Sequence, residues 1–141
     1  MTEPITSFKN QYAFLSNFYP AIIKIKELEF KTVEHAYQYY KVDDPMGAQL
    51  IIAAPTPGIA KRLGNKYKRK NDWDSVKEST MLTLLFEKFK IPNLADRLIA
   101  TRDAELIEGN VWGDKYWGVC FGKGENKLGK LLMYVRSELI S

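Results

Sequence analysis

Apolar residues recur with the 3.6-residue period of a helix in segment after segment from residue 32 onward, and this pattern most constrains the fold. Within residues 72–89 it places Leu82, Leu85, Phe86 and Phe89 on one face. Similar patterns with caps and prolines at their ends predict helices at residues 32–42, 46–53, 56–64, 92–101 and 126–140.

Strand patterns are few and short. Residues 21–25 and 28–30 flank Lys26 and Glu27 and predict a hairpin. Residues 105–109 are expected to be extended, residues 119–121 to form a strand, and the aromatic residues 12–19 to form an irregular loop. The sequence thus predicts an α+β fold, mainly helical with a few short strands, as a single domain over residues 1–141.

Composition excludes several classes of protein. A chain of 141 residues that is 45% hydrophobic can bury a core without disulfides or metals. The single cysteine, Cys120, and the single histidine, His35, leave no intramolecular disulfide and no structural zinc site. Nothing suggests a metal or a cofactor. The start lacks the features of a signal peptide and no stretch is long enough to cross a bilayer, so we expect a cytoplasmic protein without a membrane partner. The oligomeric state stays open.

A basic segment suggests an anionic partner. The net charge is +4, and six cations crowd into one part of the chain, namely Lys61, Arg62, Lys66, Lys68, Arg69 and Lys70. Such a segment can attract a phosphate or a nucleic-acid backbone, although a charge run is more often a solvated surface.

The first predicted helix carries a polar row beside its apolar face. Glu34, Gln38 and Lys41 follow the spacing i, i+4 and i+7. The row is either a solvated face or a carboxylate aimed into a cleft near the helix N-terminus, where the dipole favours an anion. Position alone leaves both interpretations open. His35 points about 100° away from Glu34 and fits a structural or surface role better than that of a base.

A second candidate is the loop at residues 110–118, where tryptophan, tyrosine and glycine flank Asp114. Its tryptophans could fill the core, or Trp112 could stack on a planar heterocycle while Asn110 and Asp114 hydrogen-bond it. Trp73 offers the same choice between a core residue and an aromatic wall.

Together these segments resemble the YbiA-like or NADAR family. The motifs are FLSNF at residues 14–18, TVEHAYQ at 32–38 with Lys41, DW at 72–73, NVWGD at 110–114, YWG at 116–118, GEN at 124–126 and LG at 128–129. They occur in family order from about residue 8 to about residue 139.

The resemblance implies an enzyme that hydrolyses the N-glycosidic bond between ribose and a base-like heterocycle. The substrate would be a phosphorylated ribosylamino-pyrimidine intermediate of riboflavin synthesis or ADP-ribosylated guanine in nucleic acid. Carried over by motif, Glu34 and Asp114 are the catalytic candidates, with Glu34 as the principal one. The implied substrate contacts are Asn17, Phe18, Lys41, Trp73, Asn110 and Trp112. The alternative is a non-catalytic module that binds ADP-ribose or a nucleotide.

Overall fold

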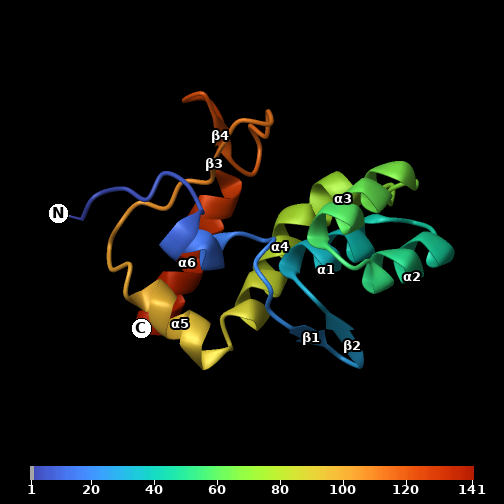
Figure 1. The fold of residues 1–141 in the computed structure, drawn as a ribbon, viewed down its shortest axis with the longest axis horizontal. Helices are drawn as coiled ribbons and strands as arrows, with labels where there is room; N and C mark the ends of the chain where they lie inside the picture. The colour runs from blue at the N-terminus through green and yellow to red at the C-terminus, as the bar shows by residue number, and fades with distance from the viewer. Residues whose placement is uncertain (1) are drawn as a thin grey trace. The chain divides into compact units, whose positions relative to one another are not determined.

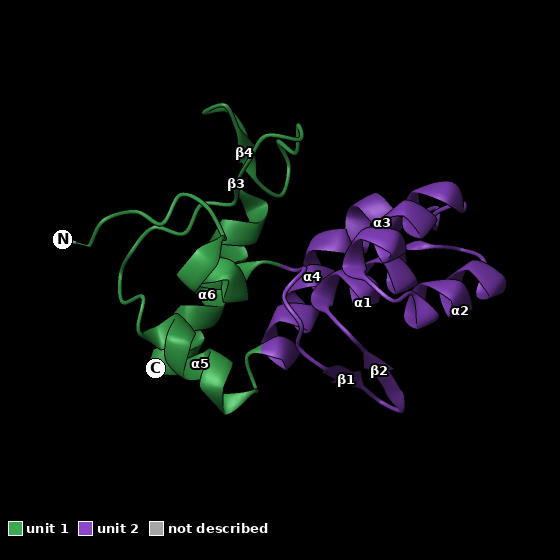
Figure 2. Cartoon of the chain, in the orientation of Figure 1, with its two compact units in different colours: residues 1–16, 89–141 green, residues 17–88 purple. Residues whose placement is uncertain are grey.

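The computed structural model describes residues 2–141. This part of the chain forms six α-helices and four short strands, with five consecutive helices between the first strand pair and the second (Figure 1). The predicted fold class, mainly helical with few strands, is confirmed. The chain contacts divide into two compact units, residues 1–16 with 89–141 and residues 17–88 (Figure 2). Each unit is described by itself, and the expected single domain over residues 1–141 stays a prediction.

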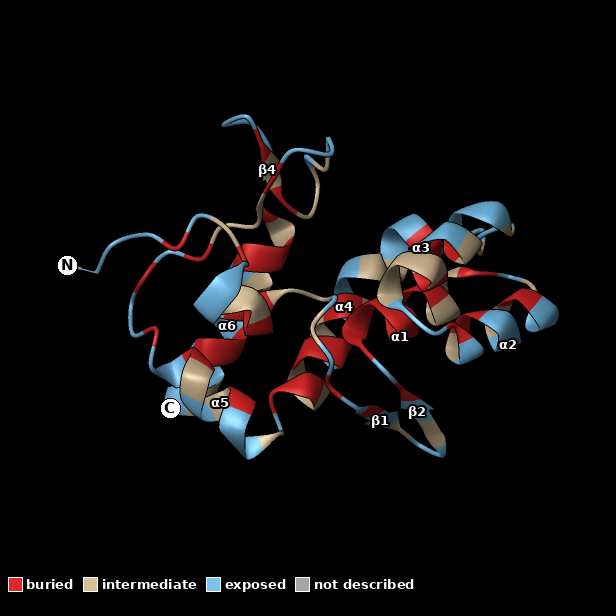
Figure 3. Ribbon diagram, viewed as in Figure 1, coloured by how far each residue is buried: buried red, intermediate tan, exposed pale blue. Residues whose placement is uncertain are grey.

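Residues 17–88 hold a hairpin and four helices. Strands β1 (Ile23–Ile25) and β2 (Leu28–Phe30) pair antiparallel, as the sequence predicts. Helices α1 (Val33–Lys41), α2 (Pro45–Ala53), α3 (Pro57–Lys66) and α4 (Trp73–Lys88) follow. Helix α1 contacts each of the other three and is largely buried (Figure 3). The side chains of α1 are therefore surrounded by α2, α3 and α4.

The starts of the first three helices follow from local chemistry. The Oγ1 atoms of Thr32 and Thr56 accept the N–H groups of the residues three positions later, and the Asp44 carboxylate does the same for Gly47. Each bond satisfies a backbone donor that the first helical turn leaves free. Helix α3 continues to Lys66, two residues beyond the predicted end at Gly64. Gly64 lies inside the helix because α3 packs closely on α1 there.

The buried face of α4 is rotated from the predicted one. Met81, Leu84, Leu85 and Lys88 are buried, whereas Leu82 and Phe86 are only partly covered. The apolar periodicity in the sequence had placed the largest apolar side chains on the buried face. A lysine, which is seldom buried, gave no signal for the last turn.

The second unit holds η1 (Asn10–Leu15), α5 (Pro92–Ile99), the two-residue strands β3 (Gly109–Asn110) and β4 (Val119–Cys120), and α6 (Lys127–Ile140). Helices α5 and α6 contact each other, and β3 and β4 pair in parallel. The prediction of an irregular loop over residues 12–19 was wrong for its first part, which forms the 3-10 helix η1. Residues 105–107 run beside Ile5, whose backbone bonds to Glu105 O and Ile107 N, and Gly109 in β3 pairs with Val119.

Helix α6 begins without a side-chain cap. Asn126 precedes it at a positive φ of 54°, and its amide turns away from the helix. The Nδ2 group donates to Leu106 O at 2.9 Å, and Oδ1 accepts from Glu108 N at 3.0 Å. Asn126 thus fastens the segment before β3 to the start of α6. Within residues 2–141, no helix is long and apolar enough to span a membrane.

Candidate active site

Glu34 lies in the first turn of α1 and only 7% of it is exposed. Its backbone N–H donates to Asn17 O at 3.1 Å. Its Oε2 atom accepts a 2.6 Å hydrogen bond from Gln38 Nε2, one turn further along the helix. Both the helix dipole and this short bond favour an ionised carboxylate. The structure therefore excludes the solvated-face interpretation for Glu34.

Gln38, which bonds the Glu34 carboxylate, packs against helix α3. Its Oε1 atom is buried and has no hydrogen-bond partner in the part of the chain that the structure describes. The backbone of Gly64 lies so close that a Cβ there would fall 1.9 Å from Gln38 Oε1. Glycine is thus needed at position 64 for this approach of the helices. The polar row pointed to Gln38, but nothing in the sequence pointed to Gly64 as its neighbour.

Lys41 is half-buried at the end of α1, where its Nζ donates to Asn65 Oδ1 at 3.2 Å. Burial lowers the pKa of Lys41. The carboxylate of Glu34 opposes that shift, while Arg69 and Lys61 add to it. The four charges therefore lie within electrostatic reach of one another. Two cations of the basic segment, separated by eight positions in the sequence, converge on the Glu34–Lys41 helix.

Asn17 and Phe18 lead into the β-hairpin. Asn17 Nδ2 makes a weak 3.6 Å bond to Met81 Sδ, and Asn17 Oδ1 is buried without a partner within residues 2–141. A buried acceptor of this kind is normally satisfied by a water, an ion or a ligand donor. The side chain of Phe18 is exposed to 42%.

Two further residues of the same unit, Trp73 and His35, are buried and contact neighbouring residues of the fold. Trp73 is 2% exposed and packs edge-on against Tyr37 at a centroid distance of 5.1 Å. His35 is fully buried between Thr32 Oγ1 (2.8 Å) and Ala54 O (2.9 Å), and burial lowers its pKa. The structural role expected for His35 agrees with these contacts.

In the other unit, Asn110 and Asp114 organise their own loop. Asn110 Nδ2 donates to Asp114 O at 2.9 Å, and Asn110 Oδ1 accepts from Asp114 N at 3.1 Å. Asp114 Oδ1 in turn accepts the backbone N–H groups of Tyr116 (3.1 Å) and Trp117 (2.9 Å). Trp112 is 58% exposed and does not fill a core.

The eight predicted site residues fall into two groups. Asn17, Phe18, Glu34, Lys41 and Trp73 belong to the unit of residues 17–88, and Asn110, Trp112 and Asp114 belong to the other (Figure 2). Within the first group, Asn17, Glu34 and Lys41 are linked by hydrogen bonds or charge. Across residues 2–141, no three acidic, histidine or cysteine side chains gather as ligands for a metal.

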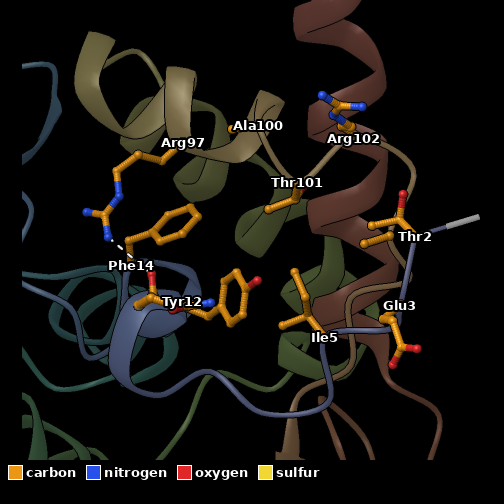
Figure 4. A pocket seen from close by; sticks show the side chains of 11 residues that line it. Thr2, Glu3, Ile5, Tyr12, Phe14, Arg97, Ala100, Thr101 and Arg102 are labelled. Carbon is orange, nitrogen blue, oxygen red and sulfur yellow. Dashed lines mark hydrogen bonds between the residues drawn. The ribbon is translucent and has the colours of Figure 1, made fainter.

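A pocket of about 690 Å³ in the unit of residues 1–16 and 89–141 contains none of these eight residues. It lies between the N-terminal segment and the end of α5 (Figure 4). Arg97 covers one side, with its guanidinium 4.4 Å from the centre of the Phe14 ring and a 3.2 Å bond to Gln11 O. The candidate catalytic residues Glu34 and Asp114 therefore do not line this pocket.

Comparison with known proteins agrees with the resemblance seen in the motifs. The NADAR domain model matches residues 5–140, which span both units. N-glycosidase YbiA of Escherichia coli K12 is 38% identical over 99% of this chain and 91% of the relative. N-glycosidase Npun_R5314 of Nostoc punctiforme is 39% identical over 91% of this chain and 86% of its own.

A longer relative and a solved structure extend the comparison. Riboflavin biosynthesis protein VVA0006 of Vibrio vulnificus is 35% identical over 99% of this chain, which spans only 39% of that protein. The NMR structure of E. coli YbiA superposes with a TM-score of 0.87 at 35% identity, covering 99% of this chain and 87% of the other. The chain therefore belongs to the NADAR domain family.

Proposed function

We propose that this chain is a cytoplasmic N-glycosidase that hydrolyses the bond between ribose and a base-like heterocycle in a phosphorylated ribosyl substrate, with Glu34 as its principal catalytic residue. The chain is a hydrolase that acts on N-glycosyl bonds, since relatives named N-glycosidases align with it over nearly their whole length. The reduced cysteine, Cys120, suits the cytoplasm. The substrate and the residue roles are the parts that need experiment.

The observation that carries the proposal is the buried carboxylate of Glu34. Departure of a base from C1′ builds positive charge on the ribose, and a fixed carboxylate stabilises that charge. Gln38 fixes one oxygen of Glu34 at 2.6 Å, and the carboxylate held in this way faces the ribosyl cation or orients the attacking water in our proposal. Water is largely excluded around Glu34, and this strengthens the electrostatic interaction.

We assign the proton for the departing nitrogen to Asp114. Its Oδ1 atom accepts two backbone N–H groups, which fix the carboxyl group, and Oδ2 would face the departing nitrogen. The exposed ring of Trp112 two residues earlier would stack on the heterocycle. The proposal divides the work between an anionic Glu34 and a proton-donating Asp114.

The cations near Lys41 are the proposed contacts for phosphate. Lys61 and Arg69 both act electrostatically on Lys41, and Arg69 also pairs with Asp74 at 3.1 Å. A phosphate would relieve the repulsion among them, and Asn17 Oδ1 would accept a bond from a ribose hydroxyl. Both substrate classes supply these groups.

The decisive test replaces Glu34 with glutamine, a change that keeps the shape of the side chain. Because the ribosyl cation loses its carboxylate, we expect turnover to fall by roughly 100-fold or more with an unchanged melting temperature. Glu29→Gln, on the exposed face of β2, is the matched control and should keep full activity. A fully active Glu34→Gln enzyme would refute the catalytic assignment.

The choice of substrate is made in the same assay. The protein is offered a riboflavin-pathway ribosylamine and DNA carrying ADP-ribosylated guanine, and the released sugar is identified. Ribose 5-phosphate indicates the first substrate and ADP-ribose the second. Saturable binding of ADP-ribose without any product would support the non-catalytic module instead and exclude the enzyme.

A further inference from the structure

A tight turn at residues 120–123 presents Phe121 to solvent. Cys120 N donates to Lys123 O at 2.8 Å, and Lys123 N donates back to Cys120 O at 3.1 Å. The two residues between them both have positive φ angles, 49° for Phe121 and 79° for Gly122. A two-residue connection with these angles is a type I′ turn.

Phenylalanine is an unfavourable residue at the first central position of this turn. Asparagine, aspartate and glycine tolerate a positive φ there, whereas a bulky side chain is strained. The side chain of Phe121 is 82% exposed and makes no ring or cation contact within residues 2–141. Phe121 therefore strains the backbone, and its ring buries little apolar surface in the fold. Contact with a molecule outside the chain would explain why a phenylalanine stands at this position.

The surroundings of Phe121 combine exposed apolar side chains with lysines. Because β3 and β4 pair Asn110 with Cys120 in parallel, the next residues, Val111 and Phe121, both leave the strand pair at the same end. Val111 is 70% exposed and Trp112 58%, and Figure 3 shows the loops beyond both strands as exposed. These residues define the aromatic loop surface: Val111, Trp112, Lys115, Phe121 and Lys123.

Charge indicates the kind of partner that this surface fits. Lys115 and Lys123 are exposed and form no ion pair within the described chain. Of the nearby acids, Glu125 lies 3.8 Å from Lys127 Nζ, and Asp114 directs Oδ1 to the backbone N–H groups of its own loop. Exposed rings interleaved with lysines are typical of surfaces that hold single-stranded nucleic acid, where rings stack on bases and lysines contact phosphates.

We propose that the aromatic loop surface binds a single nucleic-acid strand, with the Phe121 ring stacked on a base. This inference rests on the proposed function and adds to it a base-stacking contact outside the proposed catalytic residues. A small metabolite bound in a concave site has no use for a ring held out on a turn. A strand extends beyond the reacting nucleotide and can reach such a ring.

The test compares two oligonucleotides that differ only in their bases. One is a fluorescein-labelled oligodeoxyadenylate of roughly 12 nucleotides, within the usual site size, and the other is an abasic strand of the same length. The wild-type chain should bind the first about fivefold or more tightly than the second. Phe121→Asn should abolish this preference and Phe121→Trp should keep it. The salt dependence should be equal in all three, because the phosphate contacts are unchanged.

A stability measurement on the same proteins separates binding from folding. Asparagine suits the turn better, so Phe121→Asn should melt at the same temperature as the wild type or higher. An unchanged base preference in Phe121→Asn, or none in the wild type, would overturn the inference. So would a lower melting temperature, or a smaller species in gel filtration, which would assign the ring to the fold or to self-association. No turnover is needed, so the outcome is independent of the Glu34→Gln experiment.

Discussion

Lys88 offers a quantitative test of the structure. It is the last residue of α4, it is fully buried, and its ammonium lies 5.9 Å from the centre of the Tyr19 ring. The helix C-terminus and the ring both favour a cation, but burial outweighs them and lowers the pKa of Lys88 from 10.5 to about 7. Since one pKa unit corresponds to about 1.36 kcal/mol, protonated Lys88 costs the folded state about 5 kcal/mol.

The sign of the pH effect follows from the two pKa values. Between about pH 7 and pH 10.5 the unfolded chain holds the Lys88 proton and the folded chain does not, so stability rises with pH. Below about pH 7 both states are protonated and the full cost is present. Lys88→Met removes the titrating group and keeps a straight apolar side chain. Its free energy of unfolding relative to the wild type should therefore be higher at pH 6 than at pH 9 by about 2.7 kcal/mol.

Urea unfolding followed by circular dichroism at both pH values measures this difference. Lys24→Met, on the exposed side of β1, is the control, and its difference from the wild type should not change with pH. Contacts that the ammonium makes reduce the absolute gain of Lys88→Met, so the comparison between the two pH values is the informative quantity. Equal pH dependence in the wild type and Lys88→Met would refute the reasoning and show that Lys88 titrates as an exposed lysine does.

Two further substitutions test the packing that positions the site. Gly64→Ala should lower the free energy of unfolding by about 1–3 kcal/mol and also reduce turnover, because the new Cβ displaces Gln38. Gly58→Ala in the same helix meets nothing closer than 4.0 Å and should be neutral or stabilising by up to about 1 kcal/mol; thermal melts and initial rates compare the pair. Asn126→Ala should cost about 2 kcal/mol in chemical unfolding, since it removes two hydrogen bonds at a positive φ. A stability equal to the wild type would show that these bonds contribute nothing.

Local chemistry explains why most of the fold could be predicted from the sequence. The caps Thr32 and Thr56 and the prolines near helix starts act within a few residues, and together with the apolar periodicity they located all six helix starts to within one residue. The buried face of α4 and the 3-10 helix η1 were missed for the opposite reason. Both depend on packing between residues distant in the sequence, which overrides periodicity and turn propensity.

The candidate site shows the same division. The motifs identified Glu34 and Lys41, but Gln38, which bonds the Glu34 carboxylate, packs against Gly64 of α3, and only the structure shows that contact. Phe121 was missed because an aromatic residue beside a short strand normally indicates a core position. The ring is exposed because Phe121 lies in a type I′ turn, and the sequence Phe-Gly at residues 121–122 does not predict a turn of this type.

The contact between Gly64 and Gln38 makes these two positions a single unit for evolution and for engineering. A relative with alanine or a larger residue at the position of Gly64 should carry a shorter side chain at the position of Gln38, because the two volumes compete for one space. Libraries that vary position 38 or position 64 alone would mostly recover the starting pair. Varying both together opens combinations in which another donor holds the carboxylate of Glu34.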